Sequence, residues 1–167
     1  MDIKTYSEYA KKALEILPGG AFLTTANGEK INTMTIGWGT FGCQWGIPTV
    51  EVMVRQSRFT KTMLDNSQEF TITFPLDPAI KPALGFCGQK SGRDCDKIKE
   101  CSLSIVPAKE VLTPVIACKG IVFECKVVAT AEMTTDLTDK KILDKWYKNG
   151  DLHTLYYATV VDCYEIN

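Results

Sequence analysis

The segment RQSRFTK, from Arg55 to Lys61, concentrates groups that can bind an anion. It follows a predicted strand, Thr49–Val54, and overlaps a predicted short helix, Thr60–Asn66. Guanidinium groups bind phosphate through paired hydrogen bonds, and a helix N-terminus adds free N–H donors. The residue types therefore favour an anion site, with phosphate as the best-suited anion. The alternative, which the residues leave open, is a solvated loop in which Ser57 or Thr60 only caps the helix.

Two further segments carry polar groups in suggestive patterns. NTMTIGW, from Asn32 to Trp38, alternates polar and apolar residues and ends in an aromatic ring that could wall a planar heterocycle. On its own this pattern favours a half-buried strand with threonines chosen for their β propensity. SGRDCDK, from Ser91 to Lys97, packs two basic and two acidic residues before a short helix. On its own it favours a surface turn with local ion pairs of little energetic value.

Gly37–Gly42 matches the pattern GxGxxG and follows a predicted strand. A dinucleotide-binding fingerprint also needs a helix directly after the glycines, to aim N–H groups at a pyrophosphate. Gly46 and Pro48 make that helix improbable. We therefore predict a glycine-rich loop between strands here.

The chain has one histidine, His153, and seven cysteines, none of them spaced CxxC. A histidine-rich metal cage is excluded, and a zinc ribbon is disfavoured, so we expect no metal site. The N-terminal residues carry charges throughout and lack the apolar core of a signal peptide. The odd cysteine count then indicates reduced thiols and a cytoplasmic protein.

The 167 residues suit one domain spanning 1–167, and 45% hydrophobic residues can build a real core. A net charge of −1 argues against a strongly basic nucleic-acid binder. No stretch approaches the ~20 apolar residues that cross a bilayer, so no membrane partner is expected.

Hydrophobic periodicity predicts mostly strands. The predicted helices are Ser7–Leu17, Thr60–Asn66, short stretches in Asp77–Cys87, and Thr138–Tyr147, the last through Leu137, Ile142, Leu143 and Trp146. The predicted strands are Ala21–Thr25, Ile31–Trp38, Thr49–Val54, Glu69–Phe74, Leu103–Val106, Gly120–Thr130 and Thr154–Tyr164. Asn27-Gly28 indicates a hairpin turn, and Gly88–Lys97 an ordered loop. Strands that do not alternate regularly with helices favour a mainly antiparallel β-barrel with a few helices.

In their order and spacing, these segments resemble the flavin reductase-like family, and flavoredoxins are its most similar members. The resemblance rests on GGAFLTT, NTMTIGWG, VRQSRFTK, EFTITFP, SGRDCDK and HTLYYATVV, which together cover most of the chain. It implies a mainly β fold, the FMN-binding split β-barrel of Greek-key type with a few peripheral helices. It also implies a homodimer with FMN near the interface.

The resemblance assigns roles to residues that composition alone does not. The isoalloxazine ring would be bordered by Asn32, Thr33, Met34, Thr35 and Trp38. The ribityl chain and 5′-phosphate would be held by Arg55, Ser57, Arg58 and Thr60. In the next loop, Ser91 would also bind the cofactor, and Lys97 would reach the flavin or its phosphate. His153 would approach a flavin, its own or a partner subunit's, unless it is an ordinary strand-end histidine. Cys87 and Cys95 would be redox-active or simply small hydrophobic residues.

The family implies an NAD(P)H-dependent flavin reductase, in which a hydride passes from the nicotinamide C4 atom to flavin N5. FMN supplies that chemistry, so no residue is assigned as catalytic. A different class, a non-enzymatic electron carrier reduced by a partner protein, remains the alternative, and a barrel that has lost FMN is a third. No motif separates NADH from NADPH. Thr134–Asp151 has no recognisable motif, and substrate choice is expected to lie there.

Overall fold

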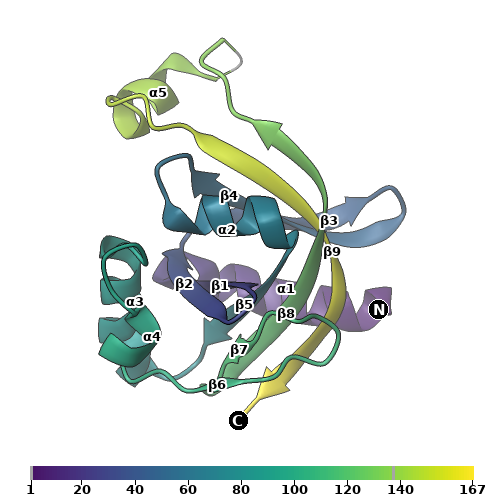
Figure 1. The fold of residues 1–167 in the computed structure, drawn as a ribbon. Coiled ribbons are helices and arrows are strands. Elements are labelled where there is room, and N and C mark those ends of the chain that lie inside the picture. The colour runs from purple at the N-terminus through teal and green to yellow at the C-terminus, as the bar shows by residue number, and fades with distance from the viewer. Residues whose placement is uncertain (1, 137) are drawn as a thin grey trace.

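The computed structural model describes residues 2–136 and 138–167. Its centre is a seven-stranded antiparallel sheet in the order β2-β1-β5-β8-β9-β4-β3 (Figure 1). The strands are β1 (Ala21–Asn27), β2 (Lys30–Ile36), β3 (Gly39–Gln44), β4 (Ile47–Arg55), β5 (Glu69–Pro75), β8 (Gly120–Glu132) and β9 (His153–Ile166). A separate pair is formed by β6 (Ile105–Val106) and β7 (Val115–Ile116). The predicted fold class, mainly β and antiparallel with few helices, is confirmed.

The helices are short and lie outside the sheet. They are α1 (Ile3–Ile16), α2 (Phe59–Ser67), α3 (Lys81–Gln89), α4 (Lys97–Glu100) and α5 (Lys140–Trp146), with 3-10 turns η1 (Leu17–Gly19) and η2 (Pro78–Ile80). In Figure 1, α2 lies between β4 and the β1–β2 hairpin, and it packs against β1, β2, β4 and β5. It therefore bridges strands from both ends of the sheet order. No helix in the described chain is long and apolar enough to cross a membrane.

The glycine-rich segment Gly37–Gly42 corrects one prediction. From Gly39 it forms β3, which pairs with β4 across the two-residue turn Trp45-Gly46, whereas we predicted a loop. Both turn residues have positive φ, 54° and 75°, as in a type I′ turn. Asparagine, aspartate and glycine favour that conformation, so a tryptophan there gave no hairpin signal. As predicted, no helix follows the glycines.

Other boundaries differ by a few residues. α1 starts at Ile3 rather than Ser7, because the Asp2 carboxylate accepts a hydrogen bond from Thr5 N at 2.9 Å and caps the helix. β2 ends at Ile36, so Trp38 lies beyond the strand. β7 was not predicted, since two residues carry no periodicity. Leu137, which directly precedes the predicted helix Thr138–Tyr147, lies outside the described residues.

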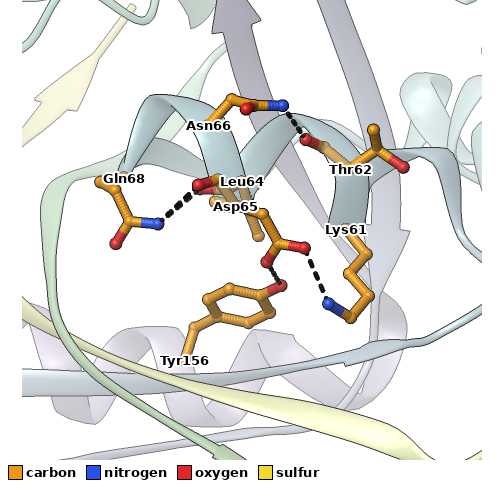
Figure 2. Close-up of polar contacts among 7 residues, drawn as sticks. All are labelled: Lys61, Thr62, Leu64, Asp65, Asn66, Gln68 and Tyr156. Carbon is orange, nitrogen blue, oxygen red and sulfur yellow. Dashed lines mark hydrogen bonds and ion pairs between the residues drawn. The ribbon is translucent and has the colours of Figure 1, made fainter.

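A polar cluster fixes α2 to the barrel (Figure 2). Tyr156, a fully buried residue of β9, donates its hydroxyl proton to Asp65 Oδ1 at 2.6 Å. Lys61 Nζ pairs with the other oxygen of the same carboxylate at 2.7 Å. Gln68 ends the helix in the left-handed conformation, and its Nε2 donates to the carbonyl oxygens of Leu64 and Asp65. These contacts tie the second half of α2 to β9.

Replacing Tyr156 with phenylalanine is expected to lower the free energy of unfolding by about 1 kcal/mol, a typical loss for one hydrogen bond. The loss stays moderate because the Asp65 side chain is 46% exposed and keeps Lys61 and water as partners. Urea unfolding measures it, with Tyr9→Phe on α1 as the matched control. An unchanged Tyr156→Phe midpoint would show that the contact does not stabilise the helix.

Candidate functional site

Two small pockets adjoin each other beside the N-terminus of α2. The first, here the Trp38 pocket, has a volume of about 110 Å³, and the second, here the Lys97 pocket, about 130 Å³. The Trp38 pocket is lined by Met34, Thr35, Ile36, Gly37, Trp38, Met53, Arg55, Arg58 and His153. The Lys97 pocket is lined by Met34, Ser57, Arg58, Phe59, Thr60, Lys90, Ser91, Gly92, Arg93 and Lys97. Met34 and Arg58 belong to both, so one elongated ligand can extend from one pocket into the other.

Lys97 places a positive charge inside the protein. It is 4% exposed, and burial lowers the pKa of its ammonium group. Its Nζ donates to the carbonyl oxygens of Cys87 and Lys90, both at 3.3 Å. An ammonium group has three N–H donors, so one is left for a ligand. Within the described chain, no carboxylate lies within ion-pair distance of Lys97, Arg58 or Arg93.

The N-terminus of α2 adds further donors to the Lys97 pocket. Arg58 is the N-cap residue, and no side chain caps the helix, so Ser57 and Thr60 do not act as caps. The capping alternative considered from the sequence is therefore wrong, and the first N–H groups of the helix lack intrahelical acceptors. Thr60 accepts a hydrogen bond from Asn32 Nδ2 at 2.9 Å, which leaves its own hydroxyl proton to donate.

The loop from Ser91 to Lys97 closes the Lys97 pocket. Arg93 Nη1 donates to Ser57 O at 2.9 Å, and Ser91 Oγ accepts from Arg93 N at 3.2 Å. Asp96 caps α4 instead of pairing with a base. Arg93 and Asp94 are exposed on a turn and Asp96 is exposed beside it, as predicted, but in the described residues no ion pair lies within this loop, so the predicted local ion pairs are wrong. The loop is bonded to the residues that precede α2.

Gly92, which lines the Lys97 pocket, is a constrained position that no sequence motif indicated. A Cβ atom placed on it would overlap the side-chain amide of Asn32 and lie 3.0 Å from Phe59 Cδ1. Only glycine lets the loop approach β2 and α2 this closely. SGR gave no signal of this requirement, because the approach joins the loop to Asn32 and Phe59, which lie 60 and 33 residues earlier in the chain.

Three of the residues assigned by resemblance have other partners or lie elsewhere. Arg55 donates to the carbonyl oxygens of Asp151 at 2.6 Å and Trp146 at 3.0 Å, and it lines only the Trp38 pocket. Ser57 lines the Lys97 pocket, but its N–H and hydroxyl both donate to the Asp151 carboxylate, at 3.0 and 2.7 Å. Thr33 lines neither pocket, and its hydroxyl donates to Leu23 O at 3.3 Å.

The remaining assigned residues lie together. The Trp38 pocket gathers Thr35, Trp38 and His153, the Lys97 pocket gathers Thr60, Ser91 and Lys97, and Met34 and Arg58 serve both. Asn32 lies behind Thr60, to which it is bonded, rather than on the wall of either pocket. Aromatic residues from the region without a motif also reach the site. Trp146 meets Trp38 edge to face, with ring centroids 4.9 Å apart, and the Tyr147 hydroxyl lies 2.7 Å from His153 Nδ1. In the sequence, only the adjacency of Trp146 and Tyr147 a few positions before His153 could have indicated these contacts.

His153 is held uncharged in its environment. It is 5% exposed, and burial, followed by the charge of Arg55, lowers its pKa from 6.5 to about 4. The thiol of Cys87 is likewise buried, and burial raises its pKa to about 12. This favours the interpretation of Cys87 as a small hydrophobic residue, because a thiol that stays protonated at neutral pH is a poor nucleophile.

The histidine makes stability depend on pH. Between about pH 6.5 and about pH 4 the unfolded chain binds a proton at His153 and the folded chain does not, so the free energy of unfolding falls as pH falls. Urea unfolding across this range is expected to show a shallower pH dependence for His153→Gln than for the unaltered chain. Parallel curves would contradict the lowered pKa.

The family comparison and the structural comparison point to the same group of proteins. The profile of the "Flavin reductase like domain" family matches residues 15–167. The fold is similar to an FMN-binding protein from Thermus thermophilus solved with bound 1-cyclohex-2-enone (TM-score 0.69, 20% identity, 87% of this chain and 69% of that chain). It is also similar to a flavoredoxin from Methanosarcina acetivorans (0.68, 22%, 87% and 67%). A third similar structure is an NADH:FAD oxidoreductase from Streptomyces globisporus (0.65, 18%, 91% and 81%). No curated protein sequence matches significantly.

Proposed function

Because this chain belongs to the flavin reductase-like domain family, we propose that it binds FMN and transfers electrons through it, as an NAD(P)H-dependent flavin reductase. The observation that carries the proposal is the Lys97 pocket. There Arg58, Arg93 and Lys97 gather beside an uncapped helix N-terminus with no carboxylate partner in the described residues. A buried cation without a counter-charge is costly, and a dianionic phosphate removes that cost.

The residues present fit FMN. Lys97, Arg58, Thr60 and Ser91 offer charge and hydrogen-bond donors to the phosphate, and Gly92 lets the loop between Ser91 and Lys97 pack closely against Asn32 and Phe59. Apolar walls for the flat ring come from Met34, Met53 and Trp38, and the 38% exposed Trp38 leaves the Trp38 pocket open toward the surface. The ribityl chain would lie along Met34 and Arg58, which line both pockets.

Bound FMN supplies the electron-accepting chemistry at N5, and the chain's residues bind and orient it. Arg58 and Lys97 hold the phosphate end. Arg55 holds the segment before β9 through the carbonyl oxygens of Trp146 and Asp151, which keeps Trp146 against Trp38. Ser57 can donate to the phosphate only if the phosphate displaces the Asp151 carboxylate, since that carboxylate accepts both the N–H and the hydroxyl hydrogen bond of Ser57.

Anaerobic reduction distinguishes the reductase from the electron carrier. The FMN-loaded protein is mixed with NADH or with NADPH, and bleaching of the flavin absorbance is followed in time. We expect rapid bleaching by at least one of them. Bleaching by dithionite or by a reduced ferredoxin alone would identify a carrier and contradict the reductase. The similarity to a flavoredoxin makes the carrier the second candidate.

We also propose a cytoplasmic homodimer. An apolar groove of about 650 Å³ between α1 and β3, with the exposed side chains of Ile3 and Leu14 along it, supports self-association. Light scattering after size-exclusion chromatography measures the mass, and a monomer at micromolar concentration would contradict the dimer.

A further inference from the structure

The connection between β8 and β9 brings a tyrosine against His153, which lines the Trp38 pocket. The connection is fastened at both ends: Met133 N donates to His153 O at 3.0 Å, and Arg55 binds the carbonyl oxygens of Trp146 and Asp151. Tyr147 follows α5 directly and is 7% exposed. Its ring lies under the Arg55 guanidinium, 5.0 Å from centroid to carbon, and stands edge-on to the His153 ring at 5.5 Å.

The hydrogen bond between these two rings determines where the histidine proton lies. The Tyr147 hydroxyl is 2.7 Å from His153 Nδ1, and it has no other partner among the described residues. A buried hydroxyl proton without an acceptor is costly, so the tyrosine donates and Nδ1 accepts. A neutral imidazole that accepts at Nδ1 carries its proton on Nε2.

Nε2 is free to serve a ligand. No described group bonds to it, and the buried side-chain nitrogen or oxygen atoms without a partner in the described chain are Thr73 Oγ1 and Thr154 Oγ1. Nε2 is therefore accessible rather than buried and unpaired. The surface that His153 presents lines the Trp38 pocket, where its ring lies 5.6 Å from that of Trp38.

The charges that face the ring keep this donor neutral. Arg55 from β4 and Arg58 before α2 both disfavour an imidazolium ion, and Asp151 opposes them only partly. Burial acts in the same direction as the two arginines and lowers the pKa of His153 to about 4. The Nε2–H group thus stays a single neutral donor across the physiological pH range.

We infer that Tyr147 is a positioning residue, which fixes the tautomer and orientation of His153 so that Nε2–H donates to an acceptor atom of the flavin ring. The inference rests on the proposed function, because it takes FMN as the occupant of the Trp38 pocket. Neither the loop nor Tyr147 belongs to any segment that carries the family resemblance. The role needs only the hydroxyl, so Tyr147→Phe removes it and keeps the ring packing with Arg55 and His153.

The single histidine makes the tautomer directly measurable. In protein labelled with ¹⁵N-histidine, NMR of the FMN-free chain at pH 7 is expected to show an unprotonated Nδ1 and a protonated Nε2. Tyr147→Phe is expected to move both nitrogen signals toward each other, as the two tautomers interconvert. The matched control, Tyr157→Phe, removes a β9 hydroxyl whose pKa is raised by burial and by Glu51, and it is expected to leave the signals in place. A protonated Nδ1 in the unaltered chain would overturn the inference.

Adding FMN tests the inferred hydrogen bond from His153 Nε2–H to the flavin ring. The Nε2 signal is expected to shift on FMN binding, and Tyr147→Phe to make the flavin reduction potential more negative, because an N–H donor favours the electron-rich reduced ring. An Nε2 signal unchanged by bound FMN would overturn the donor role while FMN binding itself stands. Absence of FMN binding would instead contradict the proposed function, and the FMN-free spectra would still report the Tyr147–His153 hydrogen bond.

Discussion

Replacing Arg58 with alanine is expected to weaken FMN binding ten- to a hundredfold. The guanidinium lines both pockets, donates to Gly88 O at 3.0 Å, and has no carboxylate partner in the described chain. Loss of one charge-assisted contact to the phosphate costs about 1.5–3 kcal/mol. Fluorescence titration of the FMN-free protein measures the dissociation constant.

Two further variants complete the Arg58 experiment. Thr60→Ala removes the hydroxyl at the start of α2 and should weaken binding in the same direction. Lys126→Ala removes an exposed cation of β8, away from both pockets, and should leave the dissociation constant unchanged. Thermal melts of all three proteins separate a binding defect from a folding defect. Unchanged flavin affinity in both Arg58→Ala and Thr60→Ala would defeat the assignment of the phosphate site.

Gly92→Ala is expected to weaken FMN binding by more than tenfold. The new methyl group would overlap the side chain of Asn32, which is buried and bonded to Thr60, and press on Phe59. Either the loop from Ser91 moves outward or Asn32 leaves Thr60, and both changes disturb the donors of the Lys97 pocket. Overpacking of this kind costs about 1–3 kcal/mol, so the melting temperature should fall as well.

Gly85→Ala is the matched control for the Gly92 variant. Gly85 lies in α3 with open space around its Cα atom, and alanine favours a helix by about 1 kcal/mol over glycine. This variant should bind FMN normally and melt at an equal or higher temperature. If Gly92→Ala bound FMN as tightly as Gly85→Ala, the loop would not be part of the cofactor site.

Local patterns predicted most of the barrel. β8 alternates exposed and half-buried side chains along its second half, and α1 repeats apolar residues at helical spacing, so both elements could be found from periodicity. β3 could not be found, because its pairing depends on a Trp45-Gly46 turn whose tryptophan has positive φ. That conformation is set by the strands on either side rather than by local preference.

The site was predictable where residue types alone indicate chemistry. Arg58 and Thr60 were assigned by their guanidinium and hydroxyl groups, Lys97 was assigned by the family resemblance alone, and all three line one pocket. Arg55 and Ser57 were assigned to the ligand, but they donate to the carbonyl and carboxylate oxygens of Asp151. The sequence could not show this, because Asp151 lies about 95 residues further along the chain. Tertiary partners of this kind leave no trace in local sequence.

The most direct measurement is a visible absorption spectrum of the freshly purified protein, followed by heat release and chromatography of any yellow cofactor. We expect a flavin spectrum and release of FMN, or uptake of one FMN per chain when the flavin is added to colourless protein. A colourless protein that also fails to take up FMN would leave the barrel fold intact and contradict the proposed cofactor site and oxidoreductase function.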